Sequence, residues 1–260
     1  MTELEIARSA AEAAGEVLMD FWNKGFTSRE KTNAGFVTDA DLAAETTIVN
    51  AIRAQRPDHE ILGEEEHDAD LSAEHLWIVD PLDGTTNFAH GLPHFAVSIA
   101  YYHRGQPHCG VIINPARNDR FETTAGGGAF HNGERVQVSE AESLDQVLVG
   151  VGFYYDRGAM MQATLAAIAD LFGQHIHGIR RFGTASLDMC HVACGLYGGF
   201  FEYQLSPWDY AAGRLFVEEA GGTVTTCTGD PLPLEKTHLL ATNTRLHPAI
   251  LEIVARHCPG

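Results

Sequence analysis

The residues best suited to chemistry lie in one short stretch, W-I-V-D-P-L-D-G-T-T-N-F at positions 77–88, where an apolar run meets two aspartates. Pro81 biases the preceding Asp80 toward an extended backbone, and Gly84 lets another group approach the backbone closely. The two threonines that follow Gly84 suit the first turn of a helix. The pattern therefore predicts a strand that turns directly into a helix, whose free amide groups and dipole would bind an anion.

Carboxylates beside an anion site require cations between them. Two like charges about 4 Å apart cost on the order of 4 kcal/mol at an effective dielectric constant of roughly 20. Ionised Asp80 and Asp83 would therefore repel a phosphate group unless metal ions intervened. Because carboxylate oxygens are hard ligands, the pair favours Mg²⁺, Mn²⁺ or Ca²⁺ over zinc.

Three other interpretations of the aspartate pair fit less well. Asp83-Gly84 alone would be a simple turn, but the strand and helix signals on either side of it favour a site. A calcium-binding EF-hand loop needs acids at alternate positions, whereas Asp80 and Asp83 are three apart with Pro81 between them. A phosphatase with an aspartate nucleophile has the pattern D-x-D-x-T, which the first aspartate misses by one position. We therefore expect water, not an aspartate, to attack the phosphorus.

Apolar periodicity predicts the elements that hold this segment. Spacings of three and four residues predict helices over 4–21, ending near Gly25, and over 39–53, 160–172, 185–196 and 209–220. Stretches rich in Val, Ile, Phe and Tyr predict strands over 77–79, 95–102, 108–113, 120–124, 135–138, 178–182, 199–203, 223–226 and 239–242. The first five strands are separated by turns and predict an antiparallel meander, whereas helices and strands alternate in the second part of the chain.

These elements predict an α+β fold in which two mixed or antiparallel sheets lie between three layers of helices, an αβαβα sandwich. The change of pattern divides the chain into an N-terminal α+β half, residues 1–145, and a C-terminal α/β half, residues 146–260. No proline- or serine-rich linker separates the halves, so we expect one compact unit.

The composition limits where and with what the protein acts. Its 260 residues carry 17 Lys and Arg against 35 Asp and Glu, and the net charge of −18 disfavours direct binding of nucleic acid. The five cysteines lack the spacing of a disulfide framework, which is typical of reduced intracellular proteins. No signal peptide and no run of ~18 apolar residues is recognisable. We therefore expect a cytoplasmic protein without a membrane partner.

The aspartate segment and the motifs around it resemble the inositol monophosphatase family. The family pattern is matched by G-E-E at 63–65, D-P-L-D-G-T-T-N at 80–87 and P-W-D-Y-A-A-G at 207–213. Further segments follow in the family's order and spacing, at 31–41, 93–100, 128–133, 183–186 and 219–222. The resemblance covers nearly the whole chain and implies a Mg²⁺-dependent, lithium-sensitive phosphomonoesterase with the layered fold of that family.

The resemblance also implies roles for individual residues. Two to three Mg²⁺ ions are expected per active site, with the ligands Glu64, Asp80, the carbonyl group of Leu82, Asp83 and Asp209. Asp41 and Thr85 are expected to orient and deprotonate the attacking water, close to a weaker third ion near Glu64. The amide groups of Gly84 and Thr85 are expected to hold the phosphate oxygens. Asp209 would otherwise be a simple cap at a helix N-terminus.

The substrate pocket follows from the same resemblance. Gly183, Thr184 and Ala185 are expected to line it, and Glu202 is expected to accept hydrogen bonds from substrate hydroxyl groups. The alternative for Glu202 is a solvated acid at a strand end. The expected reaction is the hydrolysis of inositol monophosphate to inositol and phosphate by a homodimer.

Other functions stay open at this point. Related enzymes with the same catalytic motifs act on fructose 1,6-bisphosphate, histidinol phosphate, 3′-phosphoadenosine phosphates or NADP. The alternative from a different class is a regulatory protein of the same fold, because some members of the family dock onto the transcription machinery.

Overall fold

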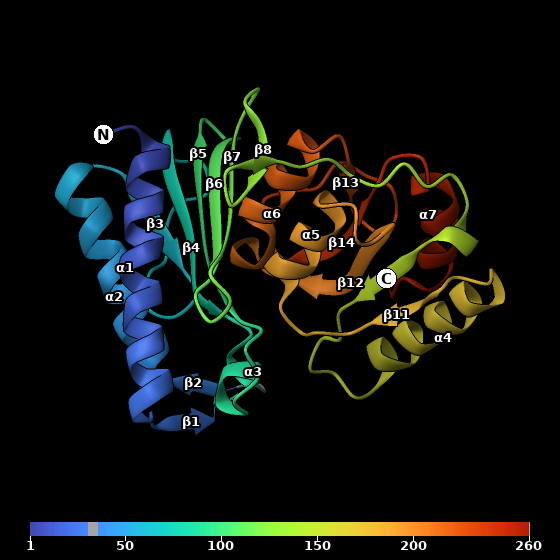
Figure 1. Cartoon of the computed structure of the whole chain (residues 1–260), viewed down its shortest axis with the longest axis horizontal. Helices are drawn as coiled ribbons and strands as arrows, with labels where there is room; N and C mark the ends of the chain where they lie inside the picture. The colour runs from blue at the N-terminus through green and yellow to red at the C-terminus, as the bar shows by residue number, and fades with distance from the viewer. Residues whose placement is uncertain (31–35, 260) are drawn as a thin grey trace.

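The computed structural model describes residues 1–30 and 36–259 and has the five layers that the sequence predicts (Figure 1). Helices α1 and α2 cover one sheet, α5 and α6 lie between the two sheets, and α4 and α7 cover the second sheet. The α+β fold class is therefore confirmed. The helices span Glu3–Lys24 (α1), Asp39–Gln55 (α2), Thr85–Ala89 (α3), Ala159–Gly173 (α4), Ala185–Ala193 (α5), Pro207–Glu219 (α6) and His247–His257 (α7).

Local sequence signals set the ends of the first two helices. The side chains of Thr2 and Thr38 each accept a hydrogen bond from the backbone N–H of the third helical residue. The carboxylate of that residue accepts a hydrogen bond from the backbone N–H of the threonine. Gly25 ends α1 at the predicted residue, with a φ of 97°. Helix α5 is shorter than predicted, because the chain turns at Gly195, where φ is 74°. Of the segment 31–41 that resembles the family, residues 31–35 lie outside the described part of the chain.

The first sheet has seven strands in the order β3-β4-β5-β6-β7-β8-β9. They span Glu60–Gly63 (β3), His75–Asp83 (β4), Ala96–His103 (β5), Gln106–Asn114 (β6), Asp119–Thr124 (β7), Gly128–His131 (β8) and Glu134–Arg135 (β9). The predicted antiparallel meander is correct from β4 to β7 and continues through the unpredicted β8, but β3 pairs with β4 in parallel. The strand predicted over 135–138 is mostly absent, because the chain leaves the sheet and Val138 donates its backbone hydrogen bond to Ala220.

The second sheet has five strands in the order β11-β10-β12-β14-β13. They span Leu148–Val151 (β10), Gly178–Arg180 (β11), Gly199–Leu205 (β12), Thr223–Thr225 (β13) and Thr237–Thr242 (β14). Strands β11, β10 and β12 are parallel, whereas β14 runs antiparallel to both of its neighbours. A short antiparallel pair, β1 (Ser28–Glu30) with β2 (Phe36–Thr38), precedes α2. The two large sheets divide the chain between residues 135 and 148, and the assignment of the halves 1–145 and 146–260 as units stays a prediction.

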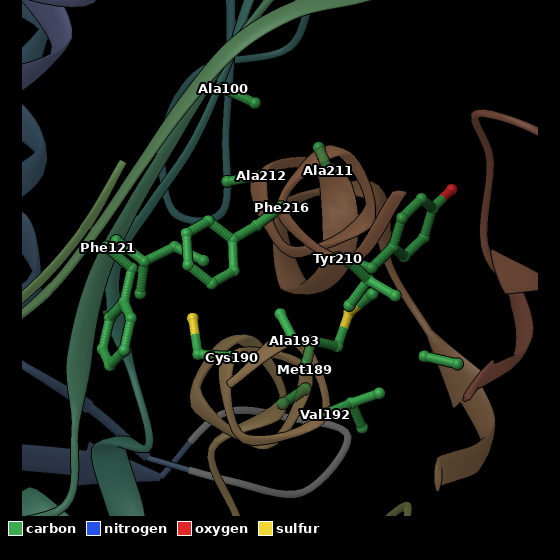
Figure 2. Close-up of a cluster of buried hydrophobic side chains, with 14 of the residues drawn as sticks. Ala100, Phe121, Met189, Cys190, Val192, Ala193, Tyr210, Ala211, Ala212 and Phe216 are labelled. Atoms are coloured by element: carbon green, nitrogen blue, oxygen red, sulfur yellow. The ribbon is translucent and has the colours of Figure 1, made fainter. Parts of the chain in front are cut away.

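The central core joins the first sheet to α5 and α6 (Figure 2). Phe121 of β7 and Phe216 of α6 meet edge to face at 5.7 Å between ring centroids. Small residues let α6 lie close to the sheet: a Cβ atom added to Gly110 would lie 3.1 Å from the Cα atom of Ala212. This packing fixes the first turn of α6 relative to the end of β4. Among the described residues, no helix is both long and apolar enough to span a membrane.

Candidate active site

Asp80 and Asp83 point to the same region because β4 contains a bulge. Along a regular strand, side chains three residues apart point to opposite faces. In β4, Asp80 pairs with Ser98 and Asp83 pairs with Ala96, so three steps along β4 match two steps along β5. The extra residue brings both carboxylates to one side at the end of the strand, where both line the same pocket.

This pocket is open to solvent, has a volume of about 950 Å³ and lies between the two halves of the chain. Glu64 enters it from the loop after β3, and Asp209 enters it from the first turn of α6. The predicted residues that line it are Glu64, Asp80, Leu82, Asp83, Gly84, Thr85, Gly183, Thr184, Ala185, Glu202 and Asp209. The structure thus brings together residues from five separate segments, while their individual roles stay predictions.

The electrostatics of the pocket disfavour four ionised acids without a counter-charge. Burial raises the pKa of Asp80 well above its ordinary value, and repulsion from Glu64, Asp83 and Asp209 adds to this shift. Burial likewise raises the pKa of Asp209 well above its ordinary value, and burial raises the pKa of Asp83 to about 7. This set of hard, mutually repelling oxygen ligands, with the Leu82 carbonyl group beside it, fits Mg²⁺.

Ser186 connects the carboxylate of Asp83 to the second half of the chain. The backbone N–H and the hydroxyl group of Ser186 donate hydrogen bonds of 2.7 and 2.5 Å to Oδ2 of Asp83. These bonds lower the pKa of Asp83 and partly offset the effect of burial. Because Ser186 lies in the first turn of α5, it fixes the orientation of Asp83. The sequence analysis did not identify Ser186 as a site residue.

Asp41 lies behind the pocket and is connected to it by a hydrogen bond from Thr85. The carboxylate of Asp41 is fully buried, and its Oδ2 accepts hydrogen bonds from the backbone N–H and the hydroxyl group of Thr38. Its Oδ1 accepts a hydrogen bond of 3.2 Å from the hydroxyl group of Thr85, which also lies 3.0 Å from the carbonyl oxygen of Leu82. The arrangement places a hydroxyl group at the pocket surface with a buried carboxylate behind it.

Glu45 holds the loop that carries Glu64. This buried carboxylate of α2 accepts hydrogen bonds of 2.9 Å from the backbone N–H groups of Glu65 and Glu66 and lies 2.7 Å from Nδ1 of His67. Gly63 leaves room for it, because a Cβ atom there would lie 2.7 Å from the Glu45 carboxylate. Glu45 was also missed from the sequence, where it looks like an ordinary polar position of an amphipathic helix.

The turn after β4 depends on a glycine. Gly84 has a φ of 89°, and a Cβ atom there would lie 2.5 Å from the Thr184 hydroxyl oxygen. That hydroxyl group donates to the carbonyl oxygen of His94 at 2.9 Å and accepts from the side-chain amide of Asn87 at 3.2 Å. Thr184 therefore borders the pocket with its hydroxyl group committed to holding the two halves together.

Glu202 lies on β12, where a second bulge interrupts the pairing with β14 between Glu202 and Leu205. Burial, and then repulsion from Asp209, raises the pKa of Glu202 well above its ordinary value. Its carboxylate packs over Gly152, where a Cβ atom would lie only 1.7 Å from Oε2. Glu202 thus lies inside the pocket with limited room to move.

The structure adds charged residues to the pocket that sequence reasoning missed. Asp188 of α5 is 1% exposed, and both of its carboxylate oxygens lack a hydrogen-bond partner. Burial raises its pKa to about 6, and Nδ1 of His191 lies 4.0 Å away, beyond hydrogen-bond distance. Its position four residues after Thr184 in a predicted helix is a signal that could have found it. The basic residues of the pocket lining are Arg157, Arg181 and Lys236.

Comparison with known proteins identifies the family. The model of the inositol monophosphatase family matches residues 2–258. The chain belongs to the inositol monophosphatase family. Among curated relatives, the Nus factor SuhB of Pseudomonas aeruginosa is 44% identical over 98% of this chain and 97% of its own. The inositol-1-monophosphatase of Synechocystis sp. is 40% identical over 98% of this chain and 89% of its own.

Solved structures of inositol monophosphatase family members have the same architecture. The IMPase of Thermotoga maritima superposes with a TM-score of 0.90 at 33% identity, covering 99% of this chain and 98% of its own. SaIMPase-II with bound inositol monophosphate superposes with a TM-score of 0.84 at 25% identity, covering 97% and 94%. The same protein with bound 2′-AMP gives a TM-score of 0.83 at 27% identity, covering 97% and 93%.

Proposed function

We propose that this protein is a Mg²⁺-dependent phosphomonoesterase that hydrolyses inositol monophosphate to inositol and phosphate. The observation that carries the proposal is the convergence of Glu64, Asp80, Asp83 and Asp209 on one open pocket. With the carbonyl group of Leu82, these residues would hold two to three Mg²⁺ ions. When bound, Mg²⁺ lowers the pKa of a water molecule and stabilises negative charge on the leaving oxygen.

The protein's own residues would prepare the water for attack. The Thr85 hydroxyl group lies at the pocket surface and donates to Asp41, so a proton released by the water can pass to the Asp41 carboxylate through Thr85. The Asp41 carboxylate is held in place for this role by the hydrogen bonds that it accepts from Thr38. The amide groups of Gly84 and Thr85 would hold the phosphate oxygens at the start of α3.

The polyol is proposed to lie on the side of the pocket formed by β12 and α5. The Glu202 carboxylate would accept hydrogen bonds from its hydroxyl groups, and Gly183 and Ala185 would contact its ring. The two SaIMPase-II complexes support a pocket that takes either inositol monophosphate or 2′-AMP in a relative. Sugar and nucleotide phosphates are therefore the alternative substrates to be compared.

Phosphate release from a panel of monoesters tests the activity and the substrate together. The panel contains inositol 1-phosphate, fructose 1,6-bisphosphate, histidinol phosphate, adenosine 3′,5′-bisphosphate and NADP, each with Mg²⁺ and with EDTA. We expect Mg²⁺-dependent release that is fastest with inositol 1-phosphate and that millimolar Li⁺ inhibits. A preference for another ester would keep the mechanism and overturn the substrate.

Asp83→Asn tests the metal assignment. The variant keeps the size of the side chain and the hydrogen bonds from Ser186, so the fold should survive. We expect turnover to fall by more than about 100-fold, the upper end of the loss seen when only an outer-shell metal partner is removed. Full activity in Asp83→Asn would refute the role of Asp83 as a metal ligand. Glu202→Gln is the matched test of the polyol contact, with a raised KM for inositol 1-phosphate expected.

A regulatory function is the second candidate, because the relative in Pseudomonas aeruginosa bears the name of a Nus factor. A protein of this kind would bind a partner whether or not it hydrolyses phosphate esters. Affinity capture with the Asp83→Asn variant as bait distinguishes the two. If the bait recovers transcription proteins and the parent protein releases no phosphate from any ester, the regulatory function would replace the enzymatic proposal.

A further inference from the structure

Two histidines and a glutamate form a compact group at the end of β4 opposite to the aspartates. Each of Glu74, His75 and His103 offers one ligand atom, and these three atoms lie within 4.8 Å of one another. From His75 to Asp80 the strand covers about 16 Å at ~3.3 Å per residue, so this group is separate from the pocket. Neither the family resemblance nor the proposed function uses any of its residues.

The sheet holds the two histidines in place. His75 of β4 and His103 of β5 are direct partners in the antiparallel register, so their side chains leave the sheet on the same face. Their rings are stacked, with 5.0 Å between centroids and 9° between planes. The ring of His59 also stacks on His75, at 4.3 Å and 4°. The strand register therefore keeps the two imidazole groups side by side, and one ring must turn out of the stack for both lone pairs to reach one ion.

Hydrogen bonds prepare the histidines further. Nδ1 of His75 lies 2.6 Å from the hydroxyl oxygen of Tyr101. When that oxygen accepts the Nδ1 proton, Nε2 of His75 keeps its lone pair, which is the arrangement that orients metal-bound histidines in proteins. Nε2 of His103 lies 3.6 Å from Oε1 of Glu74, so the carboxylate is already beside the second ring.

We propose that Glu74, His75 and His103 form a binding site for a divalent transition-metal ion such as Ni²⁺ or Zn²⁺. Two imidazole groups and one carboxylate match the ligand preference of these ions, whereas Mg²⁺ prefers a set of oxygen ligands. The side chains of Glu74 and His103 are 54% and 42% exposed, so water molecules can complete the coordination. The bound ion would link the first residue of β4 to the last residue of β5.

Arg104 competes with the ion for the carboxylate. Its Nη2 and Nε atoms donate hydrogen bonds of 2.7 and 3.1 Å to Oε1 of Glu74. Metal binding must displace or share this contact, which weakens the site. We therefore expect opposite effects at two neighbouring positions. Removal of the His103 side chain should weaken metal binding, and removal of the Arg104 charge should strengthen it.

Calorimetric titration of the full chain with NiCl₂ tests the site, with excess MgCl₂ present so that the pocket carboxylates do not contribute. We expect one ion per chain, at least about tenfold weaker binding in His75→Gln and His103→Gln, and a loss of about 10-fold in Tyr101→Phe. Arg104→Gln should bind more tightly than the parent. His257→Gln is the matched control, because His257 also pairs with a carboxylate, Asp170 at 2.8 Å, but lacks a second histidine within the group.

Three outcomes would refute the proposal. Unchanged Ni²⁺ affinity in His103→Gln, with the thermal transition in EDTA unaltered, would overturn the site. Unchanged affinity in Glu74→Gln would show that Glu74 is not a ligand and would overturn the three-residue assignment. Equal loss in His257→Gln would indicate unspecific binding to histidines and would also refute the proposal. Phosphatase activity enters none of these readouts, so the test is independent of the proposed function.

Discussion

Asp188 is a buried carboxyl group whose burial the nearby His191 and Arg181 offset only in part. Asp188 is 1% exposed and lies at the pocket wall, and its oxygens accept no hydrogen bond from the described residues. An unpartnered buried carboxylate destabilises the folded state whenever it is ionised. A residue that is unfavourable for stability and borders a substrate pocket is typical of sites kept for binding or catalysis.

The pKa of Asp188 predicts how its replacement changes stability. Burial raises this pKa to about 6 in the folded protein, so between about pH 4 and pH 6 the folded state binds a proton that the unfolded chain has lost. The contribution of Asp188 to the free energy of unfolding therefore falls as the pH rises from about 4 to about 6. We expect Asp188→Asn to raise the free energy of unfolding by up to about 3 kcal/mol near pH 7.5, and by much less near pH 4.

Urea denaturation at the two pH values measures this difference. Asp68→Asn, which removes an exposed carboxylate from a loop, is the control for the change in net charge. A loss of stability in Asp188→Asn near pH 7.5 would contradict the prediction and would indicate a stabilising partner for Asp188.

At the scale of elements, α2 positions the loop after β3 through a single side chain. Glu45 receives two backbone hydrogen bonds from this loop and contacts His67, so the direction of Glu64 depends on a residue about 20 positions earlier. The tight fit of Gly63 against the Glu45 carboxylate leaves the loop little freedom. Glu45 therefore acts on the site through Glu64 and is a positioning residue.

Glu45→Gln should loosen this loop without unfolding the protein. A glutamine side chain has one acceptor oxygen in place of two, so one of the two loop N–H groups loses its partner. We expect the Mg²⁺ concentration for half-maximal activity to rise about 10- to 100-fold, while kcat recovers at saturating Mg²⁺. Glu66→Gln, which changes an exposed side chain of the same loop, should leave both values unchanged.

Local patterns predicted the elements that the chain forms within a few neighbouring residues. The turn from β4 into α3 was predicted because Asp80, Pro81 and Gly84 determine its backbone directly. The missed elements include helix α7 and the short strands β1, β2, β3 and β8. Strands β3 and β8 have only four residues each, too few for a periodic pattern to stand out, and β8 begins within the glycine run 126–128.

Site residues that depend on distant contacts could not be predicted in the same way. Ser186 is 103 positions from Asp83, and its role becomes visible only when α5 is packed beside β4. The two bulges are likewise a property of strand pairing, not of either strand alone. The resemblance to the family supplied Asp209 and Glu202, whereas the residues that support the predicted ligands had to come from the structure.

At the scale of the whole molecule, buried carboxyl groups link stability to both pH and metal. The raised pKa values of Asp80, Asp83 and Asp209 mean that these groups hold protons in the folded protein at pH values where the unfolded chain is ionised. Stability without a bound cation therefore decreases as the pH rises through the pKa of Asp83, about 7. The proposed Mg²⁺ ions would bind the ionised form and offset this loss.

We expect Mg²⁺ at about 100 times its Kd to raise the melting temperature near pH 8 by on the order of 5 °C. The increase should be smaller near pH 5.5, because protons then compete with the ion. Thermal unfolding with MgCl₂ or EDTA at both pH values measures the effect, and Asp83→Asn should reduce it. An equal increase at both pH values would argue against binding to the buried carboxylates.

One apolar surface supports the prediction of a homodimer. Leu92, Phe182 and Leu196 are 53%, 43% and 59% exposed, and all three line a second hollow of about 640 Å³. Contiguous exposed apolar residues of this kind commonly mark an interface. We expect light scattering to give the mass of two chains for the parent and of one chain for Leu196→Glu. Leu165→Glu, on the exposed face of α4, should remain a dimer, and a monomeric parent would refute the prediction.

The hydrogen bond from Ser186 to Asp83 has a consequence for biosynthesis. Asp83 leaves the ribosome 103 residues before the residue that orients it, and Asp209 follows later still. A chain that ends before Ser186 has the two aspartates of β4 but neither the serine nor the last carboxylate. A chain of this length would lack part of the proposed metal site, so we expect it to release no phosphate.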